Sequence, residues 1–281
     1  MLSPKLRNLE QNSGFIRTLF LILRKIQISS QNFKFEVQAS LRAFGFEDKR
    51  YSKLKKFRNI HKGERCFIIA TGPSLTIEDM EKLKDEYTFG MNSICLVFDK
   101  TDFRPTYFGI QDEHVYEKIK EKLILHCKEN VFVSSNICAL YDVPEQWITF
   151  PLNISYHAFQ TRFYQKYFAK FSDDCYRAVY DGYSITYSLI QIAIYMGFKE
   201  IYLLGCDCNY SDDKNKQHFV ESGHYDPTYK TAGERMIAAY KVAKRYADNH
   251  DIKIFNATRG GKLEVFPRVD LDEVLSYKEK V

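Results

Sequence analysis

A short glycine-containing turn, Thr71-Gly72-Pro73-Ser74, follows an apolar run and precedes an acidic segment of helical pattern. Glycine lets a backbone approach a ligand closely, and the N-terminus of a following helix offers N–H groups and a positive dipole end to a phosphate. The turn has neither the P-loop spacing nor the GxGxxG spacing of a dinucleotide-binding fold. It predicts either a nucleotide contact of another type or a plain turn in which Ser74 or Thr76 caps the helix.

Two more polar turns follow the next apolar runs. Asn92, in Gly90-Met91-Asn92-Ser93, can hydrogen-bond a base or a ribose without adding charge, or can form a turn with its own backbone. Asp112, in Gln111-Asp112-Glu113-His114, can bind a ribose, a metal or a substrate. Exposed acidic residues are common in loops, so a purely structural role for Asp112 stays open.

The densest group of polar and titratable residues comes with a later strand and the loop after it: Gly205, Asp207, Tyr210, His218 and His224. A carboxylate at a strand end is costly to bury without a partner. The polar loop that follows is long enough to act as a lid over the edge of a sheet. A histidine whose pKa lies near neutrality suits a general base. The group as a whole favours a functional site, although either histidine alone is compatible with a solvated loop.

The last strand is followed by Asn256-Ala257-Thr258-Arg259-Gly260-Gly261. Two glycines beside a guanidinium form a plausible anion clamp, with Arg259 as its charged group. A simple Gly-Gly turn is the alternative.

These turns need strands and helices to position them, and the apolar pattern provides both. Short, continuous apolar runs indicate strands that are buried on both faces. Segments of helical pattern alternate with them, most clearly Tyr183–Met196 with Gly197 as its C-cap, and Tyr229–His250. The sequence therefore predicts an α/β, Rossmann-like fold with a mostly parallel sheet, helices on both faces and ligand-binding loops at the carboxyl ends of the strands. The expected strands are Arg65–Ala70, Phe89–Met91, Tyr107–Ile110, Val131–Val133, Ile148–Phe150, Lys199–Gly205 and Ile252–Asn256.

The N-terminal part of the chain differs from the remainder in charge. Residues 1–63 contain 14 Lys and Arg against 4 Asp and Glu, whereas residues 64–281 contain 27 against 32. We expect a basic helical extension over residues 1–63, with residues 49–62 as a solvated connector helix, and a catalytic domain over 64–281. Residues 14–28 form a basic amphipathic pattern that can lie on an anionic membrane, pack on the body of the protein or mediate a dimer.

Composition and cysteine usage exclude several classes of protein. The longest apolar run suited to a membrane is Leu19–Leu23, far short of the ~20 residues that a spanning helix needs. The basic excess lies in one segment, whereas a nucleic-acid-binding protein would more often carry it across the folded domain. The 7 cysteines are scattered without a CxxC motif, so we expect reduced thiols, a cytoplasmic protein and no secretory signal.

Several of these segments resemble known families. Phe67–Leu75, Met91-Asn92 and Gly197–Asp207 resemble bacterial sialyltransferases of glycosyltransferase family 42. Together with Asn256–Arg268 they are also similar to a wider family around archaeal 6-hydroxymethylpterin diphosphokinases and motility-associated flagellin glycosyltransferases. The resemblance covers residues 64–270 and leaves out the basic extension.

The resemblance implies roles for individual residues. Thr71, Gly72, Pro73 and Ser74 fall on the nucleotide loop, with Thr71 where the sialyltransferases have asparagine. Asn92 falls on an asparagine that contacts nucleotide and donor, and Asp112 lies near another asparagine of the donor site. Tyr210 lies within one residue of a tyrosine that holds the leaving phosphate, and His224, or less favourably His218, is the candidate base. Gly205, Asp207 and Arg259 complete the expected donor site.

The implied reaction is inverting, metal-independent transfer of a nonulosonic acid from a CMP-activated donor to a glycan acceptor in surface polysaccharide biosynthesis, without a cofactor. Two alternatives stay open. One is an ATP- and Mg²⁺-dependent diphosphokinase acting on a hydroxymethyl pterin, with Asp112 and Asp207 as available acids. The other is a binding module without turnover. We also expect a homo-oligomer, located in the cytoplasm or peripherally at the inner face of the membrane.

Overall fold

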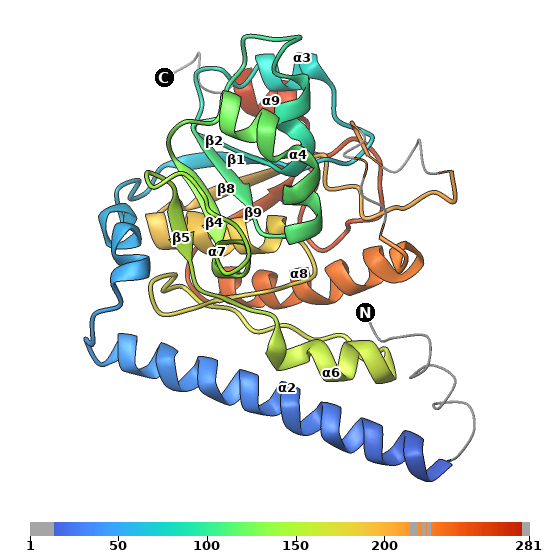
Figure 1. Cartoon of the computed structure of the whole chain (residues 1–281). Helices are drawn as coiled ribbons and strands as arrows, with labels where there is room; N and C mark the ends of the chain where they lie inside the picture. The colour runs from blue at the N-terminus through green and yellow to red at the C-terminus, as the bar shows by residue number, and fades with distance from the viewer. Residues whose placement is uncertain (1–13, 214–217, 221–222, 224–225, 277–281) are drawn as a thin grey trace. The chain divides into compact units, whose positions relative to one another are not determined.

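The computed structural model describes residues 14–213, 218–220, 223 and 226–276 (Figure 1). The chain divides into two compact units, one made of Met1–Phe46 and Asn153–Tyr167, the other of Glu47–Leu152 and Phe168–Val281. Residues 47–63, which the sequence analysis assigned to the extension, group with the second unit in this division.

The second unit is built on a parallel sheet in which seven described strands take part. Their order is β5-β4-β3-β2-β1-β8-β9, and each neighbouring pair is parallel. The order runs through consecutive strands from β5 to β1 and then jumps to β8, so β1 and β8 flank a topological switch point. The strands are β1 (Arg65–Ile69), β2 (Thr88–Met91), β3 (Tyr107–Ile110), β4 (Val131–Ser134), β5 (Ile148–Phe150), β8 (Glu200–Leu204) and β9 (Lys253–Asn256).

Both faces of this sheet are buried, as the continuous apolar strands predicted. In β1, Cys66 and Ile68 face one apolar core while Phe67 and Ile69 face the other. The first core contains α7 (Ile185–Met196), whose residues are all buried, and the apolar side of α8 (Ala232–Asp248). The second core is covered by α3 (Ile77–Glu81), α4 (Glu113–His126) and α9 (Leu271–Ser276). Figure 1 shows these helices as two layers on opposite faces of the sheet, which confirms the α/β prediction.

Short elements complete the second unit. η2 (Asn92–Val97) follows β2, α5 (Ser135–Cys138) follows β4, and η4 (Tyr229–Thr231) precedes α8. The short strands β6 (Leu152–Asn153) and β7 (Val179–Tyr180) pair in a second sheet. α7 ends at Gly197, which has a φ of 98° and is the C-cap that the sequence predicted. All 7 cysteines lie in the described part of the chain, and all are free thiols.

Two segments of this unit differ from expectation. Residues 49–62 are not a solvated helix, because η1 (Lys49–Phe57) buries Tyr51 and Leu54 in the first core. α4 was not predicted from the sequence, where its first residues were interpreted as a loop. Its apolar residues, among them Tyr116, Ile119 and Leu123, cover the second core between many charged ones.

The other unit contains α2 (Gly14–Ala43) and α6 (Ser155–Tyr164). α2 includes the helix expected over residues 14–28 and continues in the same conformation as far as Ala43. Among the described residues, no helix is both long enough and apolar enough to cross a membrane.

Candidate functional site

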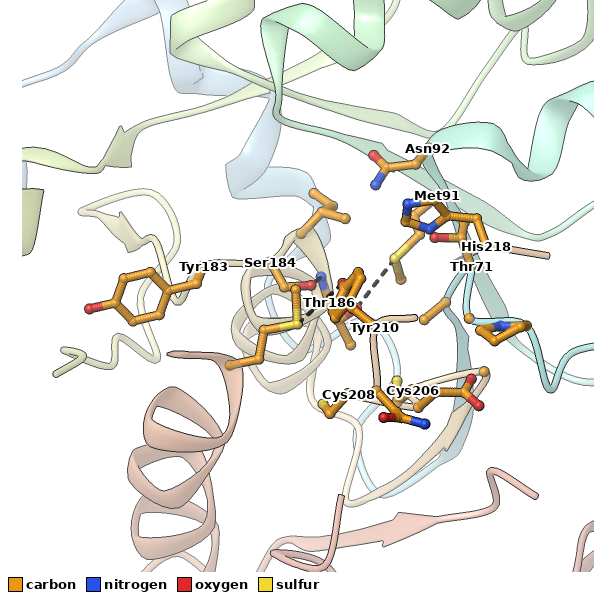
Figure 2. A pocket seen from close by; sticks show the side chains of 18 of the residues that line it. Thr71, Met91, Asn92, Tyr183, Ser184, Thr186, Cys206, Cys208, Tyr210 and His218 are labelled. Atoms are coloured by element: carbon orange, nitrogen blue, oxygen red, sulfur yellow. Dashed lines mark hydrogen bonds between the residues drawn. The ribbon is translucent and has the colours of Figure 1, made fainter. Parts of the chain in front are cut away.

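A cavity lies at the carboxyl edge of the sheet, at the switch point between β1 and β8 (Figure 2). It is lined by the residues that follow β1, β2, β3 and β8, by the N-terminal residues of α7 and by two side chains of α8. Parallel α/β sheets bind ligands at such switch points because the loops on the two sides diverge there.

The cavity brings together nine of the residues singled out from the sequence: Thr71, Gly72, Pro73, Asn92, Asp112, Gly205, Asp207, Tyr210 and His218. Ser74 and Arg259 do not line it, although Ser74 hydrogen-bonds one of its residues. His224, the favoured candidate base, lies outside the described residues. Residues from five separate segments therefore meet at one cavity.

The floor of the cavity is a close contact between the turns after β1 and β8. The Gly72 N–H donates to the Gly205 carbonyl oxygen over 2.8 Å. A Cβ at position 72 would lie 2.0 Å from Asp207 Oδ2 and 2.4 Å from the Gly205 oxygen, so no larger residue fits without movement of the turns. Gly205 has a φ of 63°, a conformation that favours glycine. Both glycines are thus required by the geometry of this floor.

Asp207 holds this floor together. Its carboxylate accepts a hydrogen bond of 2.8 Å from Ser74 Oγ, and its backbone oxygen accepts one of 2.7 Å from the Lys262 N–H. Burial raises the pKa of the Asp207 carboxyl, and the Ser74 hydrogen bonds oppose that rise. Asp207 therefore joins the loop after β8 to the turn after β1.

Asn92 presents an unsatisfied polar atom at the cavity. Its backbone has a φ of 48°, and its Oδ1 is buried with no hydrogen-bond partner among the described residues. A buried acceptor without a partner costs about 1–3 kcal/mol, and such groups need an explanation. A ligand N–H or O–H that reaches Oδ1 would remove this cost.

The N-terminus of α7 opens into the same cavity, a feature that the sequence analysis did not identify. Ser184, Ile185 and Thr186 line the cavity, and the Ser184 side chain caps the helix by accepting from the Thr186 N–H over 3.2 Å. Thr186 Oγ1 donates to Met91 Sδ over 3.4 Å, which ties α7 to the end of β2 (Figure 2). α7 has 12 residues, so its N-terminus carries a full dipole end that favours an anionic group. The serine before the helical pattern was the available sequence signal.

A hydrogen-bonded network fixes the neighbouring wall. Gln111 Nε2 donates to Asp181 Oδ1 over 3.1 Å, and Gln111 Oε1 accepts from Ser188 Oγ over 2.7 Å. Asp181 Oδ1 also accepts from the N–H of Tyr183, which has a φ of 68°. This network joins β3 to α7 and holds the cavity wall in one conformation.

Asp112 is the N-cap of α4. Its Oδ1 accepts from the backbone N–H groups of His114 and Val115 over 2.8 and 3.0 Å. These bonds give Asp112 the purely structural role that the sequence left open. The residue also lines the cavity.

Tyr210 and His218 come together at the remaining wall. Their ring centroids lie 6.1 Å apart in an edge-to-face arrangement. Tyr210 Oη donates to Met236 Sδ over 3.7 Å, which is a weak bond, and burial raises the pKa of the phenol. A phenol is protonated at neutral pH even at its ordinary pKa of about 10, and the raised pKa strengthens that preference, so Tyr210 is a hydrogen-bond donor at this wall.

Arg259 lies in a separate groove, lined also by Ser74, Asp79 and Arg268. Its guanidinium contacts both Asp79 oxygens, over 2.7 and 2.6 Å, and the Ser74 carbonyl oxygen over 2.9 Å. Thr76 and Asp79 also form a complete capping box at the start of α3. Residues of the chain itself therefore occupy the N-terminus of α3 and the Arg259 guanidinium, both of which the sequence suggested as anion-binding groups. Of the two caps that the sequence allowed, Thr76 is the one in the structure.

The acidic side chains at the cavity offer few metal ligands. In the part of the chain that the structure describes, no three His, Cys, Asp or Glu residues form a group able to hold a metal ion. Asp112 and Asp207, the two acids at the cavity, both accept hydrogen bonds from protein donors.

Comparison with known proteins places this fold. A protein-family model described as 6-hydroxymethylpterin diphosphokinase MptE-like matches residues 43–213. A solved structure of the MAf glycosyltransferase from Magnetospirillum magneticum AMB-1 is similar over 82% of this chain, with a TM-score of 0.50 and 15% identity, and this chain spans 40% of that protein. The sialyltransferase CstII from Campylobacter jejuni, solved with cytidine-5'-monophosphate, is similar over 74% of this chain and 85% of its own, with a TM-score of 0.46 and 13% identity. No curated protein matches this chain.

Proposed function

Because the chain belongs to the 6-hydroxymethylpterin diphosphokinase MptE-like family, we propose that it is a transferase that binds a nucleotide-activated donor in the cavity at the β1/β8 switch point. The donor that the resemblance of residues 64–270 to sialyltransferases implies is a CMP-linked nonulosonic acid. The reaction is inverting transfer of that sugar to a glycan acceptor in surface polysaccharide biosynthesis.

The observation that carries the proposal is the pairing of two groups at one cavity. The N-terminus of α7 suits a phosphate. Asn92 Oδ1, which has no hydrogen-bond partner among the described residues, suits a donor group on a base or sugar. A nucleotide is a common ligand that carries both an anionic phosphate and hydrogen-bonding ring substituents. The close packing of Gly72 on Asp207 lets the backbone itself form the floor beneath it.

In the proposed reaction the acceptor hydroxyl oxygen attacks the anomeric carbon of the donor sugar. The bond from that carbon to the phosphate oxygen breaks, CMP leaves, and the hydroxyl proton passes to a histidine. His218 lines the cavity and is the candidate base among the described residues, with His224 as the alternative. Tyr210 donates a hydrogen bond to the departing phosphate, whose negative charge grows as the bond breaks.

The remaining predicted residues divide by position. Thr71, Gly72, Pro73 and Gly205 form the floor near the nucleotide, and Asp112 lies at the wall beside it. Ser74 and Arg259 support the site from behind, through Asp207 and Asp79.

A diphosphokinase acting on a hydroxymethyl pterin is the second candidate, because the description of the matching family names that activity. Such an enzyme transfers pyrophosphate from ATP and holds Mg²⁺ with acidic ligands. Asp112 and Asp207 would have to hold the ion, but both carboxylates already accept hydrogen bonds from backbone or serine donors. These bonds use one oxygen of each carboxylate, and Mg²⁺ at a nucleotide usually takes one or two carboxylates together with the phosphates, so the dependence on Mg²⁺ has to be measured.

A thermal-shift series separates the candidates. The full chain is melted with CMP, CDP, UDP, GDP, and ATP with MgCl₂, each at 100 times its expected dissociation constant, where a specific ligand stabilises by ~2.7 kcal/mol. Selective stabilisation by CMP is the expected result. Selective stabilisation by ATP with MgCl₂ would replace the glycosyl-transfer proposal with the diphosphokinase.

Turnover assays then test the chemistry. Transfer from a CMP-activated nonulosonic acid should continue in EDTA, whereas pyrophosphate transfer should stop. The His218→Ala and His224→Ala variants are assayed in parallel, and the base is the one whose loss lowers kcat without lowering affinity for CMP. If the wild-type chain binds CMP but shows no turnover, the protein is a binding module.

A further inference from the structure

Helix α2 carries two apolar faces, and α6 covers one of them. Phe20 of α2 and Phe163 of α6 pack edge-to-face with ring centroids 6.3 Å apart. Asn153 Nδ2, just before α6, donates to Asn32 Oδ1 over 2.9 Å. This side of α2 thus has a protein partner within its own unit.

The other face of α2 is an exposed apolar stripe. Three of its side chains are exposed by more than 60%: Phe15 by 78%, Ile26 by 61% and Phe33 by 71%. At 3.6 residues per turn the members fall within one arc of about 100° along the whole helix. The apolar stripe consists of Phe15, Leu19, Ile22, Leu23, Ile26, Phe33, Val37 and Leu41.

The charges of α2 identify the kind of partner. The helix contains five basic residues and one acidic residue, Glu36. Lys25 and Lys34 lie on opposite sides of the apolar stripe by the same helical geometry. Arg17, Arg24 and Arg42 lie on the side opposite the stripe, Glu36 lies near one edge, and Ser30 and Ser40 interrupt the apolar arc. An apolar face on a helix with this excess of basic residues matches an anionic bilayer surface.

A second copy of the helix matches this face less well. A coiled-coil seam follows a seven-residue repeat. The best such repeat in α2 runs through Ile16, Leu19, Leu23, Ile26, Phe33 and Val37, but it also includes Ser30 and Ser40 and leaves Phe15, Ile22 and Leu41 outside the seam. Two α2 helices would also bring like charges together. A lipid surface requires no such repeat, because a straight helix keeps its 3.6-residue periodicity on a flat interface.

We propose that the apolar stripe of α2 inserts into the headgroup region of an anionic membrane and holds the protein there peripherally. The inference stands on α2 and α6 alone and does not depend on the reaction at the cavity. It extends the membrane contact expected for residues 14–28 to Leu41.

The test is co-sedimentation of the full chain with vesicles of phosphatidylcholine alone or mixed with phosphatidylglycerol. The Ile22→Gln/Ile26→Gln variant should bind the mixed vesicles at least tenfold more weakly, because it lacks two apolar side chains that would be buried in the bilayer. Leu140→Gln, which alters an apolar side chain exposed by 64% outside α2, is the matched control and should bind like wild type. Circular dichroism and thermal melts verify that each variant is folded.

A fluorescence reporter gives a second measurement. Trp147 is the only tryptophan and is 2% exposed, so wild-type emission should not change when vesicles are added. A Phe33→Trp variant should show a blue shift with phosphatidylglycerol vesicles and none with phosphatidylcholine alone. Equal binding to both vesicles, or monomers that bind neither, would overturn the proposal. A wild-type protein that is dimeric and does not bind vesicles, and whose dimer dissociates in the Ile22→Gln/Ile26→Gln variant, would also overturn the proposal. In that case a second copy of the chain covers the apolar stripe.

Discussion

Two hollows lie side by side at the carboxyl edge of the sheet and share Gly205, but they differ in how their polar groups are paired. In the Arg259 groove, the guanidinium, the Asp79 carboxylate and the start of α3 all bond to one another. In the switch-point cavity, Asn92 Oδ1 has no partner among the described residues, and Tyr210 donates only to a sulfur atom. The sequence left the guanidinium beside two glycines open between an anion clamp and a simple turn. In the structure the guanidinium is paired, and the amide and the phenol are the groups that face a ligand.

This contrast shows that the type of a residue is a weaker guide to a binding site than whether its polar atoms already have hydrogen-bond partners in the protein. A polar group that is paired inside the protein contributes to stability, whereas one left unpaired in a cavity lowers stability until a ligand arrives. Variants in the groove should therefore change stability, and variants in the cavity should change binding and turnover.

The largest expected effect is that of Gly72→Ala. Its Cβ would meet Asp207 Oδ2 at 2.0 Å and the Gly205 oxygen at 2.4 Å, so the floor must open, at a cost of about 3 kcal/mol or more in free energy of unfolding. Urea denaturation measures this change. The matched control is Gly260→Ala in the groove, where φ is 66° but no atom lies within 4 Å, and which should cost about 1–2 kcal/mol. Equal costs for the two variants would contradict the close contact.

Tyr210→Phe should lower kcat for glycosyl transfer by about 10²-fold, because one donor to the departing phosphate is lost. Its Tm should change little, since within the described part of the chain the substitution removes only the weak bond to Met236 Sδ. Tyr246→Phe is the control: that hydroxyl donates to Asp173 over 2.9 Å, away from the cavity, and kcat should stay at the wild-type value. An unchanged kcat for Tyr210→Phe would remove this residue from the mechanism.

Arg259→Ala should lower the free energy of unfolding by about 2 kcal/mol at pH 7, because the Asp79 carboxylate is left largely buried without its partner. The Arg259 and Thr76 hydrogen bonds outweigh burial and hold the pKa of Asp79 below its ordinary value of 3.8. A lowered pKa stabilises the fold above that value, and the contribution is lost as the pH falls through the folded pKa. The variant should therefore be less destabilised, relative to wild type, below pH 3 than at pH 7, with unchanged affinity for CMP. Loss of CMP affinity at constant stability would make Arg259 a ligand-binding group.

The smallest expected effect is that of Asn92→Gly, which keeps the positive φ without strain. Affinity for CMP should fall about tenfold, the value of one hydrogen bond, while the Tm of the unliganded protein should not fall, because the cost of burying the unpaired acceptor is removed. Calorimetric titration measures the first and a thermal melt the second. A large drop in Tm with unaltered affinity would show that Asn92 has only a structural role.

Much of the fold could be predicted from the sequence because its strands are continuous apolar runs that only a parallel sheet buries on both sides. α7 was predictable for the same reason, with Gly197 marking its end. α4 could not be predicted, because its many charged residues obscure the few apolar ones that face the sheet, and Asp112 looked like a loop acid when it is a helix cap. The basic composition of residues 49–62 hid the buried Tyr51 and Leu54 in the same way.

The sequence predicted that the polar turns meet at one place, because each turn follows the end of a strand and parallel strands bring those ends to one edge of the sheet. What the sequence could not provide was the pairing between segments far apart in the chain. Arg259 and Asp79 are 180 residues apart in the chain. Because they are bonded, the guanidinium stabilises the first turn of α3. The opening of the α7 N-terminus into the cavity is likewise a property of packing.

A crystal soaked in CMP tests the central claim most directly. The account predicts nucleotide density in the switch-point cavity, with the phosphate at the N-terminus of α7 and a nucleotide donor within hydrogen-bond distance of Asn92 Oδ1. Density in the groove beside Arg259, or a cavity without nucleotide at a CMP concentration that stabilises the protein in solution, would contradict it.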